Sequence, residues 1–354
     1  MTWRRTWLAA LVAASTLIAT VYGAILMIDP YETVWFAPPF DRQPIARDQR
    51  YSAPALARKA QYDSAIIGTS STRLMRPGLL NGAFGAAFVN LSVDNALPFE
   101  QDRLLAVFLR HHGRPKIVLL GIDHTMWCRE YDQAPAVARR KLPDALYDED
   151  RWNELPLLLS RRVLLHGYEE LVYLAGLGPQ KWGKDGYTAW LAPDRYDPVR
   201  VQRYLYGPPG APPDPELNRA ADDLPADRLL WRFAHIEWHG RMLDRIPDET
   251  LKIVVVMPTH RVAHGRPAGR VALRMEECKR RIFAIDARYR NLHVLDFAFD
   301  SDITRHDRNY WDQVHLTEEV AERFQALIAE GVRRRRGERD LFDYVDVRRL
   351  AGGD

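Results

Sequence analysis

The sequence is poor in cysteine, with two residues, Cys128 and Cys278, in a chain of 354. Two cysteines are too few for a disulfide framework or a cysteine-built zinc site. They leave two alternatives open, a single bridge in an oxidising compartment or two unrelated thiols. No other grouping of residues has the spacing of a metal site, and we expect neither a metal nor a cofactor.

No charge of one sign dominates the chain. Lys and Arg number 50 against 47 Asp and Glu, and the excess lies at the two ends, in Arg4, Arg5 and the run 333–336. The remainder is slightly acidic, which argues against a nucleic-acid-binding surface. The stretch 68–72 (Gly-Thr-Ser-Ser-Thr) lacks the Gly-Lys of a P-loop, which argues against nucleotide binding. With 47% hydrophobic residues, the chain can bury one large core or two modest ones.

Charge is absent from one long stretch near the amino terminus. Residues 6–28 contain no charged side chain, and these 23 residues are enough to span a bilayer as a helix. Arg4 and Arg5 precede the stretch, so the positive-inside rule predicts a cytoplasmic amino terminus and an extracytoplasmic remainder. A cleaved signal peptide is the alternative. We favour an uncleaved inner-membrane anchor, because the run exceeds the roughly 7–15 residues of a signal core and no Ala-x-Ala site follows it.

The rest of the chain divides by composition into three parts. Residues 29–60 are expected to form a membrane-proximal connector and first helix, 61–332 an α/β domain, and 333–354 a basic C-terminal tail. Apolar runs typical of buried strands alternate with helical patterns, which predicts a parallel sheet covered on both faces. The strands are expected at 65–67, 87–91, 116–121, 251–257 and 291–297, and the helices at 51–61, 98–112, 229–243, 270–289 and 318–332.

The pattern changes between about residues 130 and 228. This segment is helical in part, over 155–174, and rich in Trp, Tyr and Pro. We expect a mostly helical insertion on the α/β domain. Its aromatic side chains could line a carbohydrate groove, since aromatic rings offer flat apolar faces, or could simply form the core of the insertion.

The most informative polar residues follow the expected strands. Ser70 comes after the strand 65–67, where open α/β sheets bind their ligands. A serine hydroxyl needs a base, and Asp312-Gln-Val-His315 offers an imidazole with a carboxylate to orient it. That loop also follows a strand, so it is expected on the same sheet edge. The alternative is that His315 and Asp312 merely cap a turn and a helix. Ser71 competes as nucleophile, but the Gly-x-Ser spacing favours Ser70.

Four short motifs occur in a recognisable order: Gly68-Thr-Ser70, Asn90-Leu-Ser92, Gly121-Ile-Asp123 and Asp312-x-x-His315. They resemble the sequence blocks of SGNH (GDSL-like) hydrolases. More specifically, the chain looks like the membrane-anchored SGNH-like proteins of polysaccharide O-acetylation, such as the alginate O-acetylation proteins and the D-alanyl transfer protein of teichoic acids. Asp29-Pro-Tyr31 and Asp296-Phe also fit that group. The resemblance covers about 61–330 without the insertion, and implies a three-layer αβα, flavodoxin-like fold.

The resemblance implies a role for each motif. Ser70 would be the nucleophile, His315 the general base and Asp312 its orienter. The family's oxyanion hole uses the nucleophile's N–H, a Gly N–H and an Asn side chain. In this chain Ser92 stands where Gly is expected and Asp123 where Asn is expected. An ionised carboxylate donates no hydrogen bond to an oxyanion. The pocket residues that could fill the role or line the site are Gly68, Thr69, Asn95, His124 and His260.

The sequence thus predicts a membrane-anchored, extracytoplasmic serine O-acyltransferase or acetylesterase. Its acceptor would be a cell-envelope polysaccharide, and the resemblance implies a membrane-bound O-acyltransferase as partner. Asp123 supports an alternative of another class. In it the chain is a catalytically weak or inactive SGNH fold that binds carbohydrate or acts as a scaffold in such a complex.

Overall fold

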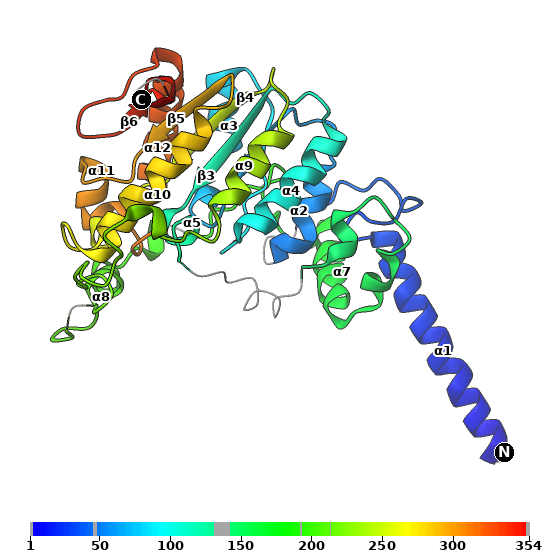
Figure 1. Ribbon diagram of the computed structural model, residues 1–354. Coiled ribbons are helices and arrows are strands. Elements are labelled where there is room, and N and C mark those ends of the chain that lie inside the picture. The colour runs from blue at the N-terminus through cyan, green and yellow to red at the C-terminus, as the bar shows by residue number, and fades with distance from the viewer. Residues whose placement is uncertain (1–2, 45–47, 131–141, 192, 213, 352–354) are drawn as a thin grey trace. The chain divides into compact units, whose positions relative to one another are not determined.

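The computed structural model describes residues 3–44, 48–130, 142–191, 193–212 and 214–351 (Figure 1). The chain forms two compact units. We call Met1–Ala55 with Pro143–Lys184 the anchor unit, and Leu56–Leu142 with Asp185–Asp354 the sheet unit. The insertion expected at 130–228 is therefore shared between the two units, and its residues 131–141 lie outside the described part of the chain.

The sheet unit is built on six strands in the order β2-β1-β3-β4-β5-β6. The first five are parallel, and β6 runs antiparallel to β5. Apart from the outer strand β6, they are mostly apolar and almost entirely buried, as expected for strands covered on both faces. The strands are β1 (Ser64–Ile67), β2 (Phe88–Asn90), β3 (Ile117–Ile122), β4 (Leu251–Val256), β5 (Leu292–Asp296) and β6 (Asp343–Val345).

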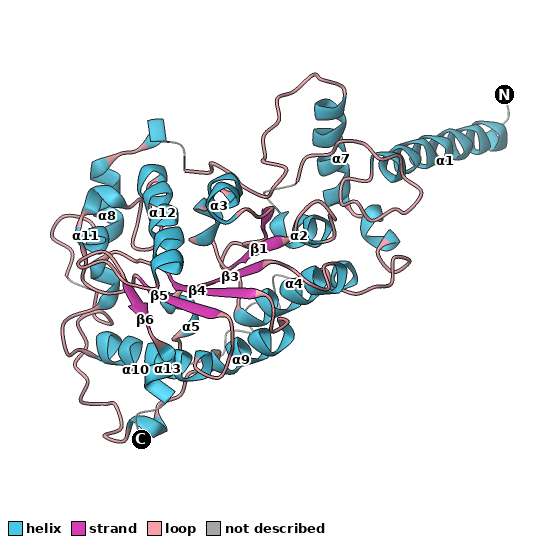
Figure 2. Cartoon of the chain, turned by 90° about the horizontal axis from the view of Figure 1, so that it is seen from above, coloured by secondary structure: helices cyan, strands magenta, loops and turns pink. Residues whose placement is uncertain are grey.

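Helices cover the sheet on both sides, which gives a three-layer α/β arrangement (Figure 2). On one side lie α3 (Pro77–Phe84) and α12 (Glu318–Arg334). The other side carries α4 (Pro98–His111), α9 (Ile236–Arg245) and α10 (Arg270–Asp286). Alternate strand residues, including Ile66, Leu119 and Ile253, pack with α3 and α12 in the main core. The residues between them point to the opposite face, because side chains alternate along a strand.

Shorter helices complete the two units. They are α2 (Gln49–Ala57), α5 (His124–Trp127), α7 (Arg161–Leu174), α8 (Pro198–Tyr206), α11 (Asp302–Arg305) and α13 (Val347–Ala351).

The segment 333–354, predicted as a basic C-terminal tail, contains regular structure in its described part. Residues 343–345 add β6 to the sheet, with Leu295 of β5 opposite Tyr344. Three residues that begin with an aspartate and are followed by another carry too little apolar pattern to indicate a strand in the sequence. Thr317 occupies the position before α12, but its side chain makes no capping hydrogen bond.

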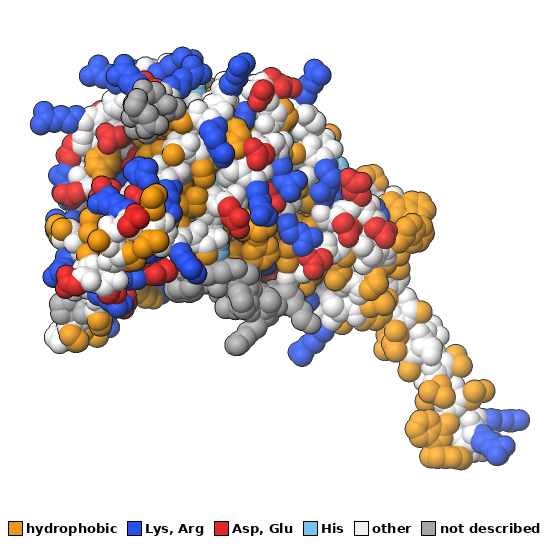
Figure 3. Space-filling view, viewed as in Figure 1, with side chains coloured by type: hydrophobic (Ala, Val, Ile, Leu, Met, Phe, Trp, Pro, Cys, Tyr) orange, Lys and Arg blue, Asp and Glu red, His pale blue; other side chains and the backbone are white. Residues whose placement is uncertain are grey.

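Helix α1 (Trp3–Ile28) is long and apolar enough to cross a membrane by length and composition. Apolar side chains are exposed along it, with basic residues at its outer end (Figure 3). Only its last turns are buried: Ile25 packs with Tyr31 and Val34 of the connector and with Leu158 in the anchor-unit core. Gly167 of α7 allows this approach, because an added Cβ there would lie 2.3 Å from Ile25 Cδ1.

The two cysteines form a disulfide in the sheet unit, which decides between the alternatives left open above. Cys128 directly follows α5 and Cys278 lies in α10, with their Cα atoms 5.6 Å apart. The bond links the segment after β3 to a helix 150 residues later in the chain.

Candidate active site

Ser70, His315 and Asp312 form a continuous hydrogen-bonded chain. Ser70 Oγ lies 2.7 Å from His315 Nε2, and His315 Nδ1 lies 2.6 Å from Asp312 Oδ2. The carboxylate can only accept, so Nδ1 carries the ring proton and the Nε2 lone pair faces the serine hydroxyl. Ser71 Oγ lies 3.1 Å from Thr69 Oγ1 instead, so it is Ser70 that meets the imidazole.

Ser70 reaches the base because the chain turns tightly after β1. Thr72 lies under this turn and donates from Oγ1 to the Thr69 carbonyl at 2.8 Å. Two glycines leave room for it. An added Cβ would lie 2.4 Å from Thr72 Oγ1 on Gly68 and 2.1 Å from Thr72 Cγ2 on Gly121. Gly68 and Gly121 therefore allow Thr72 to pack under the turn, and this packing determines where Ser70 lies at the edge of the sheet.

The base is carried by a narrow loop between α11 and α12. Tyr310 and Leu316 form an antiparallel bridge across it, and the Trp311 N–H donates to the His315 carbonyl at 2.8 Å. Asp312 Oδ1 accepts from the backbone N–H groups of Val314 and His315 at 2.8 and 2.9 Å. One carboxylate therefore both folds the turn and orients the imidazole.

The pKa of Asp312 reflects this environment. Burial alone would raise the carboxyl pKa. The hydrogen bond and charge of His315, together with the two backbone donors, outweigh burial and hold the pKa below its usual value. Asp312 is thus an anion at neutral pH, as a group that stabilises an imidazolium must be.

His260, predicted to line the pocket, lies fully buried beneath the base loop. Its backbone N–H donates to the Gln313 carbonyl at 2.8 Å. Its Nδ1 accepts from Val262 N–H at 3.3 Å, so Nε2 carries the proton and donates to Asp307 Oδ1 at 3.1 Å. Burial lowers the pKa of His260, against the opposing charge of Asp307. His260 supports the loop that carries the base and does not contact Ser70.

Asp123 follows β3 beside the nucleophile turn, but its carboxylate acts only as an acceptor. Oδ1 accepts from Thr125 N–H at 3.0 Å and from Thr125 Oγ1 at 2.6 Å, which caps α5. Oδ2 lies 3.3 Å from the Thr69 hydroxyl. Thr69 therefore donates toward Asp123, and neither side chain offers a hydrogen to an oxyanion at Ser70.

Ser92 and Asn95 are the other residues predicted to donate to an oxyanion. The Ser92 N–H donates to Asn90 Oδ1 at 3.0 Å, and its hydroxyl lies 2.7 Å from Thr72 Oγ1. Asn95 is exposed in a left-handed conformation with φ 51°. Within the described part of the chain, no hydrogen bond engages the backbone N–H of Ser70 itself. That N–H is therefore available to a group bound at Ser70.

His124, the other predicted pocket histidine, belongs to a buried pair. Its ring meets that of His264 edge-to-face at 5.7 Å, and Thr259 Oγ1 lies 3.1 Å from His264 Nε2. Burial and the nearby Lys279 charge lower the pKa of His124 to about 4. Burial and the neighbouring His124 lower the pKa of His264 to about 3. These rings are neutral at physiological pH.

Trp190 is a site residue that the sequence did not reveal. Its ring meets the His315 ring edge-to-face at 4.9 Å, so it fixes one side of the base. Arg73 lies over the same indole at 5.6 Å and pairs with Asp94 at 2.6 Å. Trp190 comes from an aromatic-rich stretch 125 residues before His315, and no spacing in that stretch distinguishes it from its neighbours.

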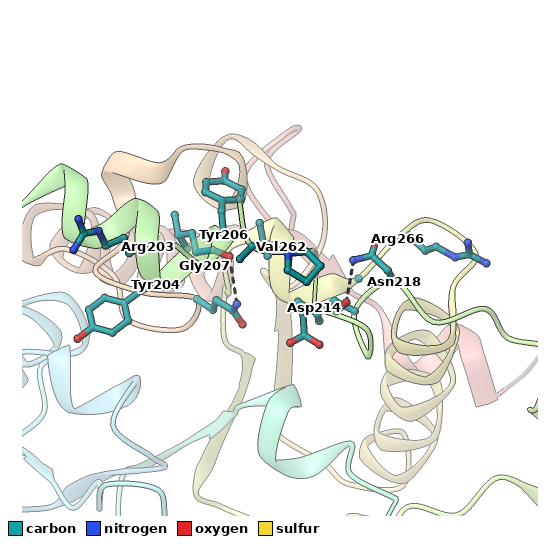
Figure 4. Close-up of a pocket in the computed structure, with 14 residues that line it drawn as sticks. Arg203, Tyr204, Tyr206, Gly207, Asp214, Asn218, Val262 and Arg266 are labelled. Carbon is teal, nitrogen blue, oxygen red and sulfur yellow. Dashed lines mark hydrogen bonds between the residues drawn. The ribbon is translucent and has the colours of Figure 1, made fainter. Parts of the chain in front are cut away.

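Open clefts surround the base loop. One cleft, of about 640 Å³, lies between the end of α8 and the 261–266 turn (Figure 4). Its lining includes Arg203, Tyr204 and Tyr206 at the end of α8 and Gln313 of the base loop. Tyr204 and Tyr206 are about half exposed, as a carbohydrate-facing surface would require. A second cleft of about 410 Å³ shares Gln313 and includes His124. A third, of about 500 Å³, is lined by Trp311 and Tyr196.

Among the described residues, no group of three or more His, Cys, Asp or Glu side chains is arranged to hold a metal ion. The chemistry that the site residues themselves offer is that of a serine nucleophile, an imidazole base and a carboxylate. No protein-family model matches the chain, and no curated protein matches it significantly.

Proposed function

We propose that this protein is an SGNH-type serine acyltransferase or acetylesterase that acts on cell-envelope polysaccharide. The observation that carries the proposal is the contact of Ser70 Oγ with His315 Nε2, backed by Asp312. The fold supports it as well. The five parallel strands follow the order 2-1-3-4-5 of flavodoxin-like sheets, and Ser70 stands at their carboxyl edge, where such sheets bind ligands.

The geometry supports a two-step acyl transfer. Ser70 Oγ attacks the acyl carbonyl carbon while its proton passes to His315 Nε2, and Asp312 stabilises the imidazolium. His315 then gives the proton to the leaving oxygen, which releases the first alcohol and leaves an acyl ester on Ser70. A sugar hydroxyl or water, deprotonated by His315, attacks that ester, and His315 returns the proton to Ser70 Oγ as the serine leaves.

The site offers few hydrogen-bond donors to an oxyanion, which predicts slow acyl transfer. The Ser70 N–H is the one available donor identified above, and loss of a single donor in such sites typically costs about 10²–10³ in rate. Loss of a donor slows attack by water and by a sugar hydroxyl alike, so transfer requires that the acceptor sugar be bound next to the acyl-serine. We therefore favour transfer to a glycan acceptor over rapid hydrolysis.

Asp123 keeps a second function open, that of a weakly active or inactive carbohydrate-binding or scaffold subunit. Its carboxylate accepts from Thr125 and Thr69 where an oxyanion hole needs a donor. The cleft bordered by Tyr204 and Tyr206 would serve glycan binding in either function. Acylation of Ser70 separates the two.

We further propose an inner-membrane anchor with the main domain outside the cytoplasm. The burial of Ile25 at the end of α1 supports a retained helix, because cleavage after it would remove part of the anchor-unit core. The Cys128–Cys278 disulfide supports an oxidising compartment such as the periplasm. A membrane-bound O-acyltransferase that supplies acyl groups is the partner proposed from the resemblance to polysaccharide acetylation proteins.

The test uses the full chain in nonionic detergent, treated with 4-nitrophenyl acetate and followed by intact mass and nitrophenol release. We expect one added acetyl group, mapped to Ser70 by peptide sequencing, and no adduct in Ser70→Ala. Ser71→Ala is the matched control and should acylate like the parent. Equal background rates in the parent and Ser70→Ala, with no adduct, would reject the covalent mechanism and leave the scaffold function.

A further inference from the structure

A polar cleft separate from the three around the base loop lies at the end of the sheet opposite Ser70. It occupies about 670 Å³ beside the start of β5 and the strand β6. His293, the second residue of β5, lies in it, whereas Ser70 follows the carboxyl end of the parallel strand β1. The cleft therefore takes no part in the proposed acyl transfer. We call it the C-terminal cleft.

Positive charge lines this cleft with little compensation. Arg335, Arg336, Arg348 and Arg349 all border it. Asp346 is the acidic residue in its lining, and it pairs with Arg349 at 3.0 Å. Within the described part of the chain, no carboxylate forms an ion pair with the other three arginines. Basic side chains gather beside the C-terminal strand in Figure 3.

The floor of the cleft is a polar pair made of a buried histidine and a half-buried tyrosine. The His293 side chain is 8% exposed, and its Nδ1 lies 2.8 Å from the Tyr344 hydroxyl. Burial lowers the pKa of His293, and the charges of Arg335 and Arg348 lower it further. Both guanidinium groups thus act on the same ring, although they come from segments 13 residues apart in the chain.

The backbone that carries the arginines is held in a demanding conformation. Arg335 ends α12 with φ 51°, a left-handed position that usually falls to Gly or Asn. Two residues later Gly337 lies against β6, where an added Cβ would be 2.7 Å from the Phe342 carbonyl oxygen. A non-glycine residue held in this conformation is a reason to look for function at the position.

We propose that the C-terminal cleft binds a phosphate group. Clustered like charges destabilise a fold, and an anion bound among them removes that repulsion. A carboxylate would neutralise one arginine, whereas a phosphate monoester carries about −1.5 to −2 charges and three acceptor oxygens. Guanidinium groups bind such oxygens in bidentate fashion. The phosphate monoester could be a small soluble one or the headgroup of a phospholipid such as phosphatidic acid, and the test distinguishes the two.

The experiment measures binding of inorganic phosphate to the full chain in nonionic detergent by titration calorimetry and thermal unfolding, against chloride at matched ionic strength. We expect saturable binding and a rise in melting temperature. Arg335→Gln combined with Arg348→Gln should weaken binding by about tenfold or more, because two bidentate partners are lost. Arg333→Gln with Arg339→Gln is the matched control, since both arginines are exposed in the same region but do not line the cleft.

A competition arm identifies the source of the phosphate. If phosphatidic acid, whose headgroup is a phosphate monoester, displaces inorganic phosphate from the parent chain in mixed micelles, the ligand is a lipid headgroup. If it does not, the ligand is a small phosphate ester. Equal phosphate affinity in the parent and the Arg335/Arg348 variant would overturn the proposal, as would binding no stronger than that of chloride. Thermal unfolding in chloride shows whether the variant is folded, and the Tyr344→Phe variant, which keeps every charge, should retain most of the affinity.

Discussion

At the scale of single residues, Asp123 bears most directly on whether the site can stabilise an oxyanion at Ser70. It stands one residue after β3, beside the turn that carries Ser70, and its carboxylate receives three hydrogen bonds from Thr125 and Thr69. One of those bonds takes the Thr69 hydroxyl as its donor, so that hydrogen is not offered to a group bound at Ser70. The negative charge also opposes an oxyanion forming close by.

Replacing Asp123 with Asn should speed acylation of Ser70. The amide oxygen can still accept from Thr125, while the amide nitrogen replaces Oδ2 beside Thr69 and removes the charge. We expect acetyl adduct formation from 4-nitrophenyl acetate to rise by about tenfold or more, toward the effect of one oxyanion donor. Stopped-flow release of nitrophenol measures it.

The matched control for this substitution is Asp94→Asn, which removes a carboxylate paired with Arg73 but not one that faces the nucleophile turn. It should leave the acylation rate within a few fold of the parent. A slower rate in Asp123→Asn would mean that the carboxylate is needed to hold the turn, and that the oxyanion is stabilised elsewhere.

At the scale of elements, the packing of Thr72 between the ends of β1 and β3 explains how the sheet positions Ser70, the proposed nucleophile. Gly121→Ala would place Cβ 2.1 Å from Thr72 Cγ2, so the turn must move. We expect a loss of about 1–3 kcal/mol in the free energy of unfolding, typical of overpacking, together with slower acylation of Ser70. Urea unfolding and the adduct assay measure the two effects.

The chain offers an internal rescue for this substitution. Thr72→Ser removes the methyl group that clashes with the Cβ added by Gly121→Ala, but keeps the hydroxyl that binds the Thr69 carbonyl. The double variant should regain most of the lost stability and activity. Gly68→Ala is the contrast, because its Cβ would meet Thr72 Oγ1 at 2.4 Å, an atom that serine retains. Rescue of Gly68→Ala by Thr72→Ser would contradict this account of the turn.

The elements also show how far the sequence could predict the structure. The five parallel strands were predictable because each lies in a short, mostly apolar run rich in Val, Ile and Leu, and Ser70 and His315 because each follows such a strand in a polar motif. Strand β6 was not, since three residues at a sheet edge leave almost no pattern. Trp190 was missed for a different reason: its place beside His315 depends on how a long insertion folds back, which no local spacing records.

At the scale of the whole molecule, the disulfide ties together elements that lie far apart in the chain. Cys128 follows α5, which Asp123 caps, and Cys278 lies in α10, which packs against β5. His124 and His264 are buried in the same region, and Lys279 beside the cysteine lies close enough to affect both rings. On this side of the sheet unit, a disulfide therefore lies near two buried histidines whose rings are neutral in the folded protein.

That combination predicts a loss of stability in mild acid. The folded-state pKa values of His124 and His264 are about 4 and about 3, below the ordinary value of 6.5. Between these values the unfolded chain takes up protons that the folded chain excludes, so stability is greatest above pH 6.5 and falls as the pH drops toward 4. His124 alone accounts for up to about 3 kcal/mol of this loss, at roughly 1.36 kcal/mol for each unit of pKa difference.

Urea unfolding of the full chain in detergent at pH 7 and pH 5, followed by tryptophan fluorescence, measures the effect. His124→Phe keeps an aromatic ring against His264 but cannot titrate, so its stability should change less between the two pH values than that of the parent. The exposed His111 provides the control, because His111→Gln should leave the pH dependence unchanged. If His124→Phe and the parent lose the same free energy between pH 7 and 5, the buried pair is not what limits stability in acid. Asp312 cannot account for a loss in this range, because its pKa lies below the ordinary carboxyl value and its contribution disappears only at lower pH.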